Sequence, residues 1–149
     1  MVLETVKKIE DTSLPVMEAF YTIQGEGHWQ GYAAYFIRLG GCDVGCHWCD
    51  VKESWDVNAH PHISVNELVN NVKEVAGNIV VITGGEPLMH NLDQLTSSIQ
   101  LAGKRTHIET SGAHKYSGTW DWFCLSPKKF KPTLEENYSK AHELKTVSY

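Results

Sequence analysis

The chain has 149 residues, of which 42% are hydrophobic and 21% charged, a composition typical of one globular domain and not of a disordered or membrane-spanning chain. Thirteen Lys and Arg residues against 18 Asp and Glu residues give a net charge of −5, which argues against a nucleic-acid partner. The N-terminal stretch MVLETVKKIEDTSLP holds no apolar run of the kind found in signal peptides or transmembrane helices. We therefore expect a cytoplasmic protein with one domain over residues 1–149 that binds neither nucleic acid nor membrane.

The first predicted elements are two strands with a helix between them. Residues 33–39, AAYFIRL, form an apolar, aromatic-rich run that ends in Gly-Gly, which predicts a buried strand entering a loop. Ser64 and Glu67 make a capping box at the start of a helix that we expect Gly77 to end. The apolar face of this helix comprises Val65, Leu68, Val69, Val72 and Val75. NIVVITGGEP then predicts a β-branched strand that also runs into a Gly-Gly turn.

The remaining segments continue this alternation. NLDQLTSSIQLAG predicts a second amphipathic helix that Gly103 stops, with its apolar positions at Leu92, Leu95, Ile99 and Ala102. THIETSG predicts a third strand and turn, and WDWFCLSP and HELKTVSY predict weaker strands. The order of the elements indicates an α/β fold of parallel strands joined by right-handed crossovers.

The distinctive motifs all follow predicted strands. GGCDVGCHWCD comes after the first strand, TGGEP after the second, ETSG after the third and SPK after the fourth. Ligands of parallel α/β folds bind at the carboxyl ends of the strands, because the loops that follow the strands meet there. We therefore expect one functional site at that edge of the sheet.

Three of the four cysteines, Cys42, Cys46 and Cys49, lie in the spacing CxxxCxxC. In a reducing compartment such a cluster indicates metal ligands or a redox site. A structural zinc site takes four ligands, and the fourth cysteine, Cys124, lies far along the chain in the apolar segment DWFCLS, where we expect a buried packing residue. Three thiolates suit a 4Fe-4S cluster in which one iron keeps an open coordination position.

These motifs together resemble the radical S-adenosylmethionine (SAM) superfamily. The resemblance lies in the cysteine spacing with aromatic Trp48 before Cys49, in TGGEP as the GGE motif, and in ETSG. It implies a partial, TIM-like barrel of parallel strands with crossover helices. It also implies that the open iron binds the amino and carboxylate groups of SAM, and that an electron from a reductant such as flavodoxin then cleaves SAM to methionine and a 5′-deoxyadenosyl radical.

A longer stretch, MEAFYTIQGEGHWQGYAAYFIRLGGC, resembles the 7-carboxy-7-deazaguanine synthases of the queuosine and 7-deazapurine pathway, and CDVKESWD and SPK add to the resemblance. Membership of this family implies a carbon–nitrogen lyase that converts 6-carboxy-5,6,7,8-tetrahydropterin into 7-carboxy-7-deazaguanine with loss of ammonia. The resemblance further implies a homodimer that depends on Mg²⁺.

The residues that match the substrate-contacting positions of the family are Ile23, Gln24, Gly25, Glu26, Arg38 and Thr83. Their chemistry suits the substrate, because a pterin edge needs paired donors and acceptors and a carboxylate suits a bidentate arginine. The alternative for Arg38 is a strand-edge salt bridge, and the alternative for QGEG is an ordinary glycine turn. His28, which lies in the same segment, has no matching role, and we expect it to be a surface or packing residue.

The residues that match SAM-contacting positions are Trp48, Cys49, Asp50, Gly85, Glu86, Glu109, Ser126, Pro127 and Lys128. Glycine at such a position lets the backbone approach the cofactor closely. For ETSG the alternative is an ordinary turn. The neighbouring lysines of the run Lys128, Lys129 and Lys131 have no motif behind them and suit a solvated face.

The chain departs from the family in two places. Many members carry Thr or Ser after the cluster Asp, where the hydroxyl binds Mg²⁺, whereas this chain has Val51, whose alkyl side chain cannot ligate a hard cation. We therefore expect that substrate, water and backbone alone hold Mg²⁺, or that the ion is dispensable. The chain also stops within the predicted strand HELKTVSY, so we expect either a short member of the family or a C-terminally truncated one.

Two other functions are consistent with parts of the sequence. An activating enzyme for glycyl-radical proteins shares the CxxxCxxC spacing but acts on a protein, and TIQGEG and Arg38 favour the small pterin instead. A non-catalytic iron–sulfur or zinc module would use the cysteines alone. Such a module has no use for TGGEP and SPK at the same edge of the sheet.

Overall fold

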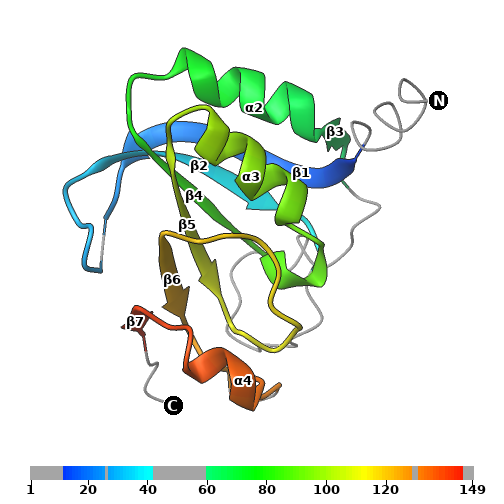
Figure 1. Cartoon of the computed structure of the whole chain (residues 1–149), viewed down its shortest axis with the longest axis vertical. Helices are drawn as coiled ribbons and strands as arrows, with labels where there is room; N and C mark the ends of the chain where they lie inside the picture. Colours follow the sequence, from blue (N-terminus) through cyan, green and yellow to red (C-terminus); the bar gives the residue numbers. More distant parts are fainter. Residues whose placement is uncertain (1–11, 26, 42–59, 129–130, 146–149) are drawn as a thin grey trace.

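A computed structural model describes residues 12–25, 27–41, 60–128 and 131–145 and shows a seven-stranded sheet with helices packed on one face (Figure 1). The strands are β1 (Ser13–Ile23), β2 (Ala33–Leu39), β3 (His62–Ser64), β4 (Ile79–Gly84), β5 (Arg105–Thr110), β6 (Trp122–Leu125) and β7 (Glu143–Leu144). The helices are α2 (Val65–Glu74), α3 (Asp93–Leu101), α4 (Glu135–Tyr138) and the 3₁₀ helix η3 (Pro87–Met89). The part of the chain that the structure describes contains no helix long and apolar enough to cross a membrane.

The strands lie in the order β3-β1-β2-β4-β5-β6-β7. The strands from β2 to β7 in this order run parallel, which confirms the predicted α/β fold, whereas β1 is antiparallel to both β2 and β3. Over the described residues the sheet ends at β3 and at β7 without closing, so the fold is a partial barrel. The sequence did not predict β1 and β3, because the buried residues of β1 follow no period of two and β3 has only three residues.

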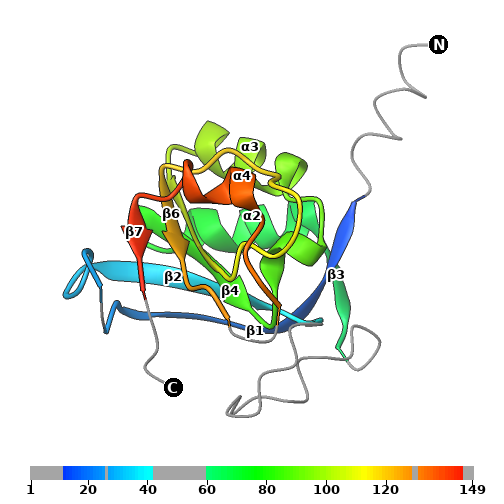
Figure 2. The ribbon, with the colours of Figure 1, turned by 90° about the horizontal axis from the view of Figure 1, so that it is seen from below.

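The two longer helices cover one face of the sheet, as Figures 1 and 2 show. The predicted apolar positions of α2 and α3 pack there against side chains of β2, β4 and β5. Ser64 Oγ accepts a hydrogen bond from the Glu67 backbone N–H at 3.1 Å, which is one half of the expected capping box. The prediction that Gly77 ends α2 was wrong, since the helix ends at Glu74 and the Lys104 ammonium donates to the carbonyls that follow it.

The opposite face of the sheet, here called the hairpin face, carries a smaller apolar cluster made of Ala34, Phe36, Ile79 and Val81 with the partly buried Phe20 and Trp29. Trp29 belongs to the loop that joins β1 to β2, residues 24–32, here called the hairpin loop. Through Trp29 this loop folds back over the hairpin face and contacts Trp122 on β6 and His107 on β5. Residues far apart in the sequence are thereby placed side by side.

Candidate active site at the carboxyl ends of the strands

The predicted motif loops meet at the carboxyl ends of the parallel strands and are joined there by backbone hydrogen bonds. The Glu86 N–H donates to the Gly41 carbonyl at 2.7 Å, which links the loop after β4 to the end of β2. The Ser126 N–H donates to the Thr110 carbonyl at 2.8 Å, which links the loop after β6 to the end of β5. The expectation that these motifs share one edge of the sheet is confirmed for the described residues.

The side chain of Glu86 joins the GGE loop to the ETSG turn. Its Oε1 accepts from the Ser111 N–H at 2.9 Å and from the Ser111 hydroxyl at 2.7 Å, and its Oε2 accepts from the Leu88 N–H at 2.9 Å and from the Thr110 hydroxyl. The residue is 1% exposed. Four donors therefore satisfy a buried carboxylate, and the predicted contact of Glu86 with SAM stays a prediction.

Gly84 is required because β4 and β2 approach each other closely at this edge. Its φ is +146°, and a Cβ at this position would lie 2.2 Å from the Leu39 carbonyl oxygen. The next residue, Gly85, donates its N–H to the same carbonyl at 3.1 Å. The glycine pair thus packs against the backbone that leads into the cysteine loop, and a side chain at position 84 would push the two strands apart.

The segment with the clustered cysteines lies outside the described residues. Seven predicted site residues therefore have no described position: Glu26, Cys42, Cys46, Trp48, Cys49, Asp50 and Val51. The residues on either side of the segment are close together, since a Cβ on Gly40 would lie 2.6 Å from the His60 ring. The ring of His90 also lies 2.9 Å from the Gly40 carbonyl oxygen. Gly40 and His60, which flank the cysteine segment among the described residues, therefore lie together at the carboxyl end of β2, and His90 of the loop after β4 lies beside them.

Arg38 and Thr83 are register partners on β2 and β4. Their neighbours along the strands, Ile37 and Ile82, face the helix-covered core. Because side chains alternate along a strand, Arg38 and Thr83 lie on the hairpin face. The Arg38 Nε lies 3.1 Å from Glu18 Oε1 without a geometry that makes a hydrogen bond. The Arg38 and Glu18 side chains are 30% and 52% exposed, so this ion pair contributes little stability.

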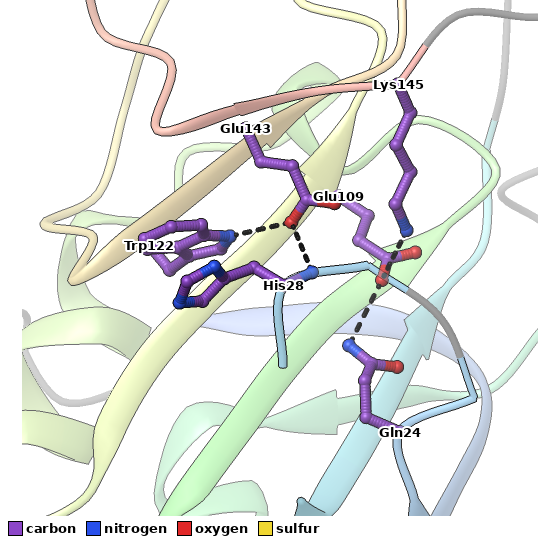
Figure 3. A network of polar contacts seen from close by, with 6 residues as sticks. All are labelled: Gln24, His28, Glu109, Trp122, Glu143 and Lys145. Atoms are coloured by element: carbon purple, nitrogen blue, oxygen red, sulfur yellow. Dashed lines mark hydrogen bonds and ion pairs between the residues drawn. The ribbon is translucent and has the colours of Figure 1, made fainter. Parts of the chain in front are cut away.

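The structure brings Gln24 and Glu109 together across the hairpin face, as Figure 3 shows. Gln24 Nε2 donates to Glu109 Oε2 at 3.5 Å, and the Lys145 ammonium lies 3.8 Å from the same oxygen. Gln24 was predicted at the substrate and Glu109 at the cofactor. The side chain of their neighbour Ile23 is 60% exposed.

A small pocket on the hairpin face lies beneath these groups, and it is lined by Gln24, Trp29, Val81, His107, Ile108, Glu109, Trp122, Cys124, Glu143 and Lys145. His107 is 2% exposed, and its Nε2 accepts from Arg105 Nε at 3.2 Å, so the ring carries its proton on Nδ1. Among the described residues His107 Nδ1 has no hydrogen-bond partner. Burial is the main cause that lowers the pKa of His107 from 6.5 to about 4. The charges of Arg105 and His142 lower this pKa further, while the carboxylate of Asp121 raises it.

This lowered pKa predicts an acid-sensitive fold. Between pH 6.5 and 4 the unfolded chain binds a proton at His107 that the folded chain does not, so the free energy of unfolding falls as the pH falls through this window. The loss attributable to His107 should approach about 3 kcal/mol at the lower end. Urea unfolding of the parent and of His107→Gln, whose amide oxygen can still accept from Arg105, measures the difference. Equal pH dependence in the two proteins would contradict the prediction.

Several residues at this site carried no signal in the sequence. Glu143, Trp122 and Lys145 fall in segments that predict only weak strands, and they reach the site because β6 lies beside β5 and β7 lies beside β6. Cys124 is 3% exposed on β6, which confirms the expected buried cysteine. The prediction that His28 is a surface or packing residue is also confirmed, since it is exposed and stacks on Trp122 with ring centroids 4.7 Å apart.

Comparison with known proteins agrees with this geometry. A model of the radical SAM superfamily matches residues 36–143. The chain is 57% identical over 136 residues to a 7-carboxy-7-deazaguanine synthase of Flavobacterium psychrophilum, covering 91% of the chain and 64% of that protein. It is 46% identical over 147 residues to a 7-carboxy-7-deazaguanine synthase of Synechocystis sp., covering 99% of the chain and 71% of that protein.

A solved structure shows the same architecture. The crystal structure of QueE from Escherichia coli superposes with a TM-score of 0.82 at 34% sequence identity, covering 90% of the chain and 70% of that protein. The chain thus spans about two thirds of the length of these relatives. From the matched motifs, the partial barrel and these similarities, the chain belongs to the radical SAM superfamily and, within it, to the 7-carboxy-7-deazaguanine synthase family.

Proposed function

We propose that this protein is a radical SAM core that converts 6-carboxy-5,6,7,8-tetrahydropterin into 7-carboxy-7-deazaguanine with loss of ammonia. The observation that carries the proposal is the meeting of Gln24, from the predicted substrate segment, with Glu109, from the predicted cofactor turn. This contact supports a substrate bound on the hairpin face, directly beside the cofactor. Residues 1–149 would form one domain with this site at its carboxyl edge.

The roles of the described residues follow from their positions. Arg38 would bind the substrate carboxylate through its guanidinium, with Thr83 beside it as a hydroxyl donor or acceptor. Gln24 would hydrogen-bond the pterin edge together with the backbone of the hairpin loop. Among the described residues, the contacts assigned to SAM would come from Gly85, Glu86, Glu109, Ser126, Pro127 and Lys128. The Glu86 side chain also holds the GGE loop in place.

The three clustered cysteines would hold the 4Fe-4S cluster with one iron open. When bound, SAM supplies the radical that abstracts a hydrogen atom from the substrate. The same family resemblance supports a cytoplasmic homodimer that receives its electron from a flavodoxin-type reductant. Light scattering of the reconstituted protein tests the dimer, and a monomer at working concentration would contradict it.

Anaerobic reconstitution tests the proposed function. The protein is loaded with iron and sulfide, reduced with dithionite and mixed with SAM and 6-carboxytetrahydropterin, and we expect 7-carboxy-7-deazaguanine as the product. SAM cleavage without this product would favour an activating enzyme for glycyl-radical proteins. A cluster that does not cleave SAM would favour a non-catalytic iron–sulfur module.

Arg38→Ala is expected to impair turnover of the pterin much more than SAM cleavage in the absence of pterin. Losing a charge-assisted bond to the substrate carboxylate should lower kcat/KM by about 10- to 100-fold, and cleavage of SAM alone should be unchanged. Glu18→Ala removes only the ion-pair partner of Arg38 and serves as the matched control. If Glu18→Ala lowered kcat/KM as much as Arg38→Ala, Arg38 would have a structural role.

We also propose that Val51 weakens the response to Mg²⁺. The ion demands near-octahedral oxygen ligands, so water must replace the missing hydroxyl. Activity should then persist without added Mg²⁺ or need a higher concentration of it, and Val51→Thr should shift the response to lower Mg²⁺. Magnesium titrations of both proteins under anaerobic turnover measure this. Coincident titration curves would remove position 51 from the metal site.

A further inference from the structure

The carboxylate of Glu143, on the last strand of the sheet, bonds to the backbone of the hairpin loop (Figure 3). Glu143 Oε1 accepts from the His28 backbone N–H at 3.3 Å and from the Trp122 indole N–H at 3.0 Å. The two donors come from segments at opposite ends of the chain, since His28 precedes β2 and Trp122 begins β6. One oxygen of Glu143, on β7, therefore connects the hairpin loop to Trp122 on β6.

The loop and the carboxylate also fit each other in shape. Gly27 has a φ of +80°, and a Cβ there would lie 2.6 Å from Glu143 Oε2, so the loop backbone packs directly on the second oxygen. The Trp122 ring, whose N–H bonds Oε1, stacks with His28 and with His142, at centroid distances of 4.7 and 5.2 Å. The two donors on Oε1 and the packing of Gly27 on Oε2 thus hold Glu143 in one orientation.

The internal bonds of the hairpin loop set its shape but not its position over the sheet. The Gln24 N–H donates to the Tyr32 carbonyl at 2.8 Å and the Gly31 N–H donates to the Gln24 carbonyl at 2.9 Å, both within the loop. The side-chain contact from Gln24 to Glu109, at 3.5 Å, is at the outer limit of a hydrogen bond. Among the described residues, the bond from His28 to Glu143 is the one that ties the loop backbone to a charged acceptor.

We propose that Glu143 is a positioning residue, which holds the hairpin loop against β6 and β7 so that Gln24 faces the substrate position beside Glu109. This inference rests on the proposed function for the identity of the substrate. Glu143 itself acts through the loop and does not touch the reacting atoms. Its loss would move Gln24, raise the KM for the pterin and leave the cofactor loops at the carboxyl edge unchanged.

Two variants at position 143 test the proposal. Glu143→Ala removes both bonds, and we expect the His28 amide hydrogen to exchange with solvent about tenfold faster and the KM for 6-carboxytetrahydropterin to rise about tenfold. Cleavage of SAM without pterin should stay at the parent rate. Glu143→Gln should restore most of both losses, because the two donors share Oε1 and a single amide oxygen can accept from both.

Amide exchange of the His28 peptide and steady-state kinetics are measured on the reconstituted protein, with Glu135→Ala on the exposed surface of α4 as the control. Parent-like exchange in Glu143→Ala would overturn the proposal, as would faster exchange with an unchanged KM. If Glu143→Ala does not fold, Glu143→Asp keeps the charge but withdraws the carboxylate from the His28 N–H by one methylene, and unchanged exchange in that variant would equally overturn it. Failure of the parent to make deazaguanine would refute the proposed function, while the exchange result would still decide whether Glu143 holds the loop.

Discussion

Alanine in place of Cys42, Cys46 or Cys49 is expected to remove the bound iron and abolish SAM cleavage, whereas Cys124→Ala should retain both. Each clustered cysteine would supply one of only three thiolates, so losing one would leave a cluster with too few protein ligands. Cys124 is buried on β6, which is separated from β2 by β4 and β5 in the sheet. Iron and sulfide content after anaerobic reconstitution, together with SAM cleavage, distinguishes the four variants.

The comparison among the cysteine variants also identifies which cysteines ligate the iron–sulfur cluster. Cys124→Ala is the matched control, because it removes the same thiol from a buried position of the same chain. Iron loss in Cys124→Ala as complete as in Cys46→Ala would indicate a four-thiolate site and would leave no open iron for SAM. Iron retained by any single variant of the clustered three would show that this cysteine is not a ligand.

Local sequence patterns predicted the elements whose burial follows a regular period. The apolar positions of α2 recur at helical spacing and face one core, and β2, β4 and β5 are short runs bounded by glycines. The parallel order then places the motif loops at one edge, because the carboxyl ends of parallel strands coincide. That reasoning placed the TGGEP, ETSG and SPK loops together at that edge, whereas the roles of Glu86, Glu109 and Ser126 come from the family resemblance and stay predictions.

Contacts between distant segments could not be predicted in this way. β1 lies between β3 and β2, but β3 pairs only with its first three residues and most of its second half is exposed, so its sequence has neither strand nor helix period. The hairpin loop reaches β6 and β7 across the hairpin face, and nothing local to Glu143 or Trp122 indicates the partner. Glu86 was found by its motif, but its bonds to Ser111 and Thr110 depend on how β4 and β5 lie together.

Glu86→Ala is expected to have the largest effect on stability of any single change at the described site. The substitution leaves the Leu88 and Ser111 N–H groups and two hydroxyls without their acceptor in a buried position. We expect the free energy of unfolding to fall by about 4 kcal/mol, since unsatisfied buried donors each cost about 1 to 3 kcal/mol and partial relaxation recovers some of the loss. Urea unfolding of the apoprotein measures it, because the effect needs no cluster or cofactor.

Glu86→Gln keeps the volume of the side chain but changes its charge and its hydrogen-bonding groups, so it shows how much each contributes to the free energy of unfolding. The amide has nearly the size of the carboxylate, but its NH₂ group must face either the two Ser111 donors or the pair from Leu88 and Thr110, so it should recover about half of the lost stability. Glu136→Ala, at an exposed position of α4, should be nearly neutral and controls for the loss of a negative charge. If Glu86→Ala unfolded at the same urea concentration as Glu136→Ala, the GGE loop would hold its place beside β2 without this carboxylate. The Gly85 and Glu86 backbone bonds to Leu39 and Gly41 would then suffice to connect the cofactor loop with the cysteine segment.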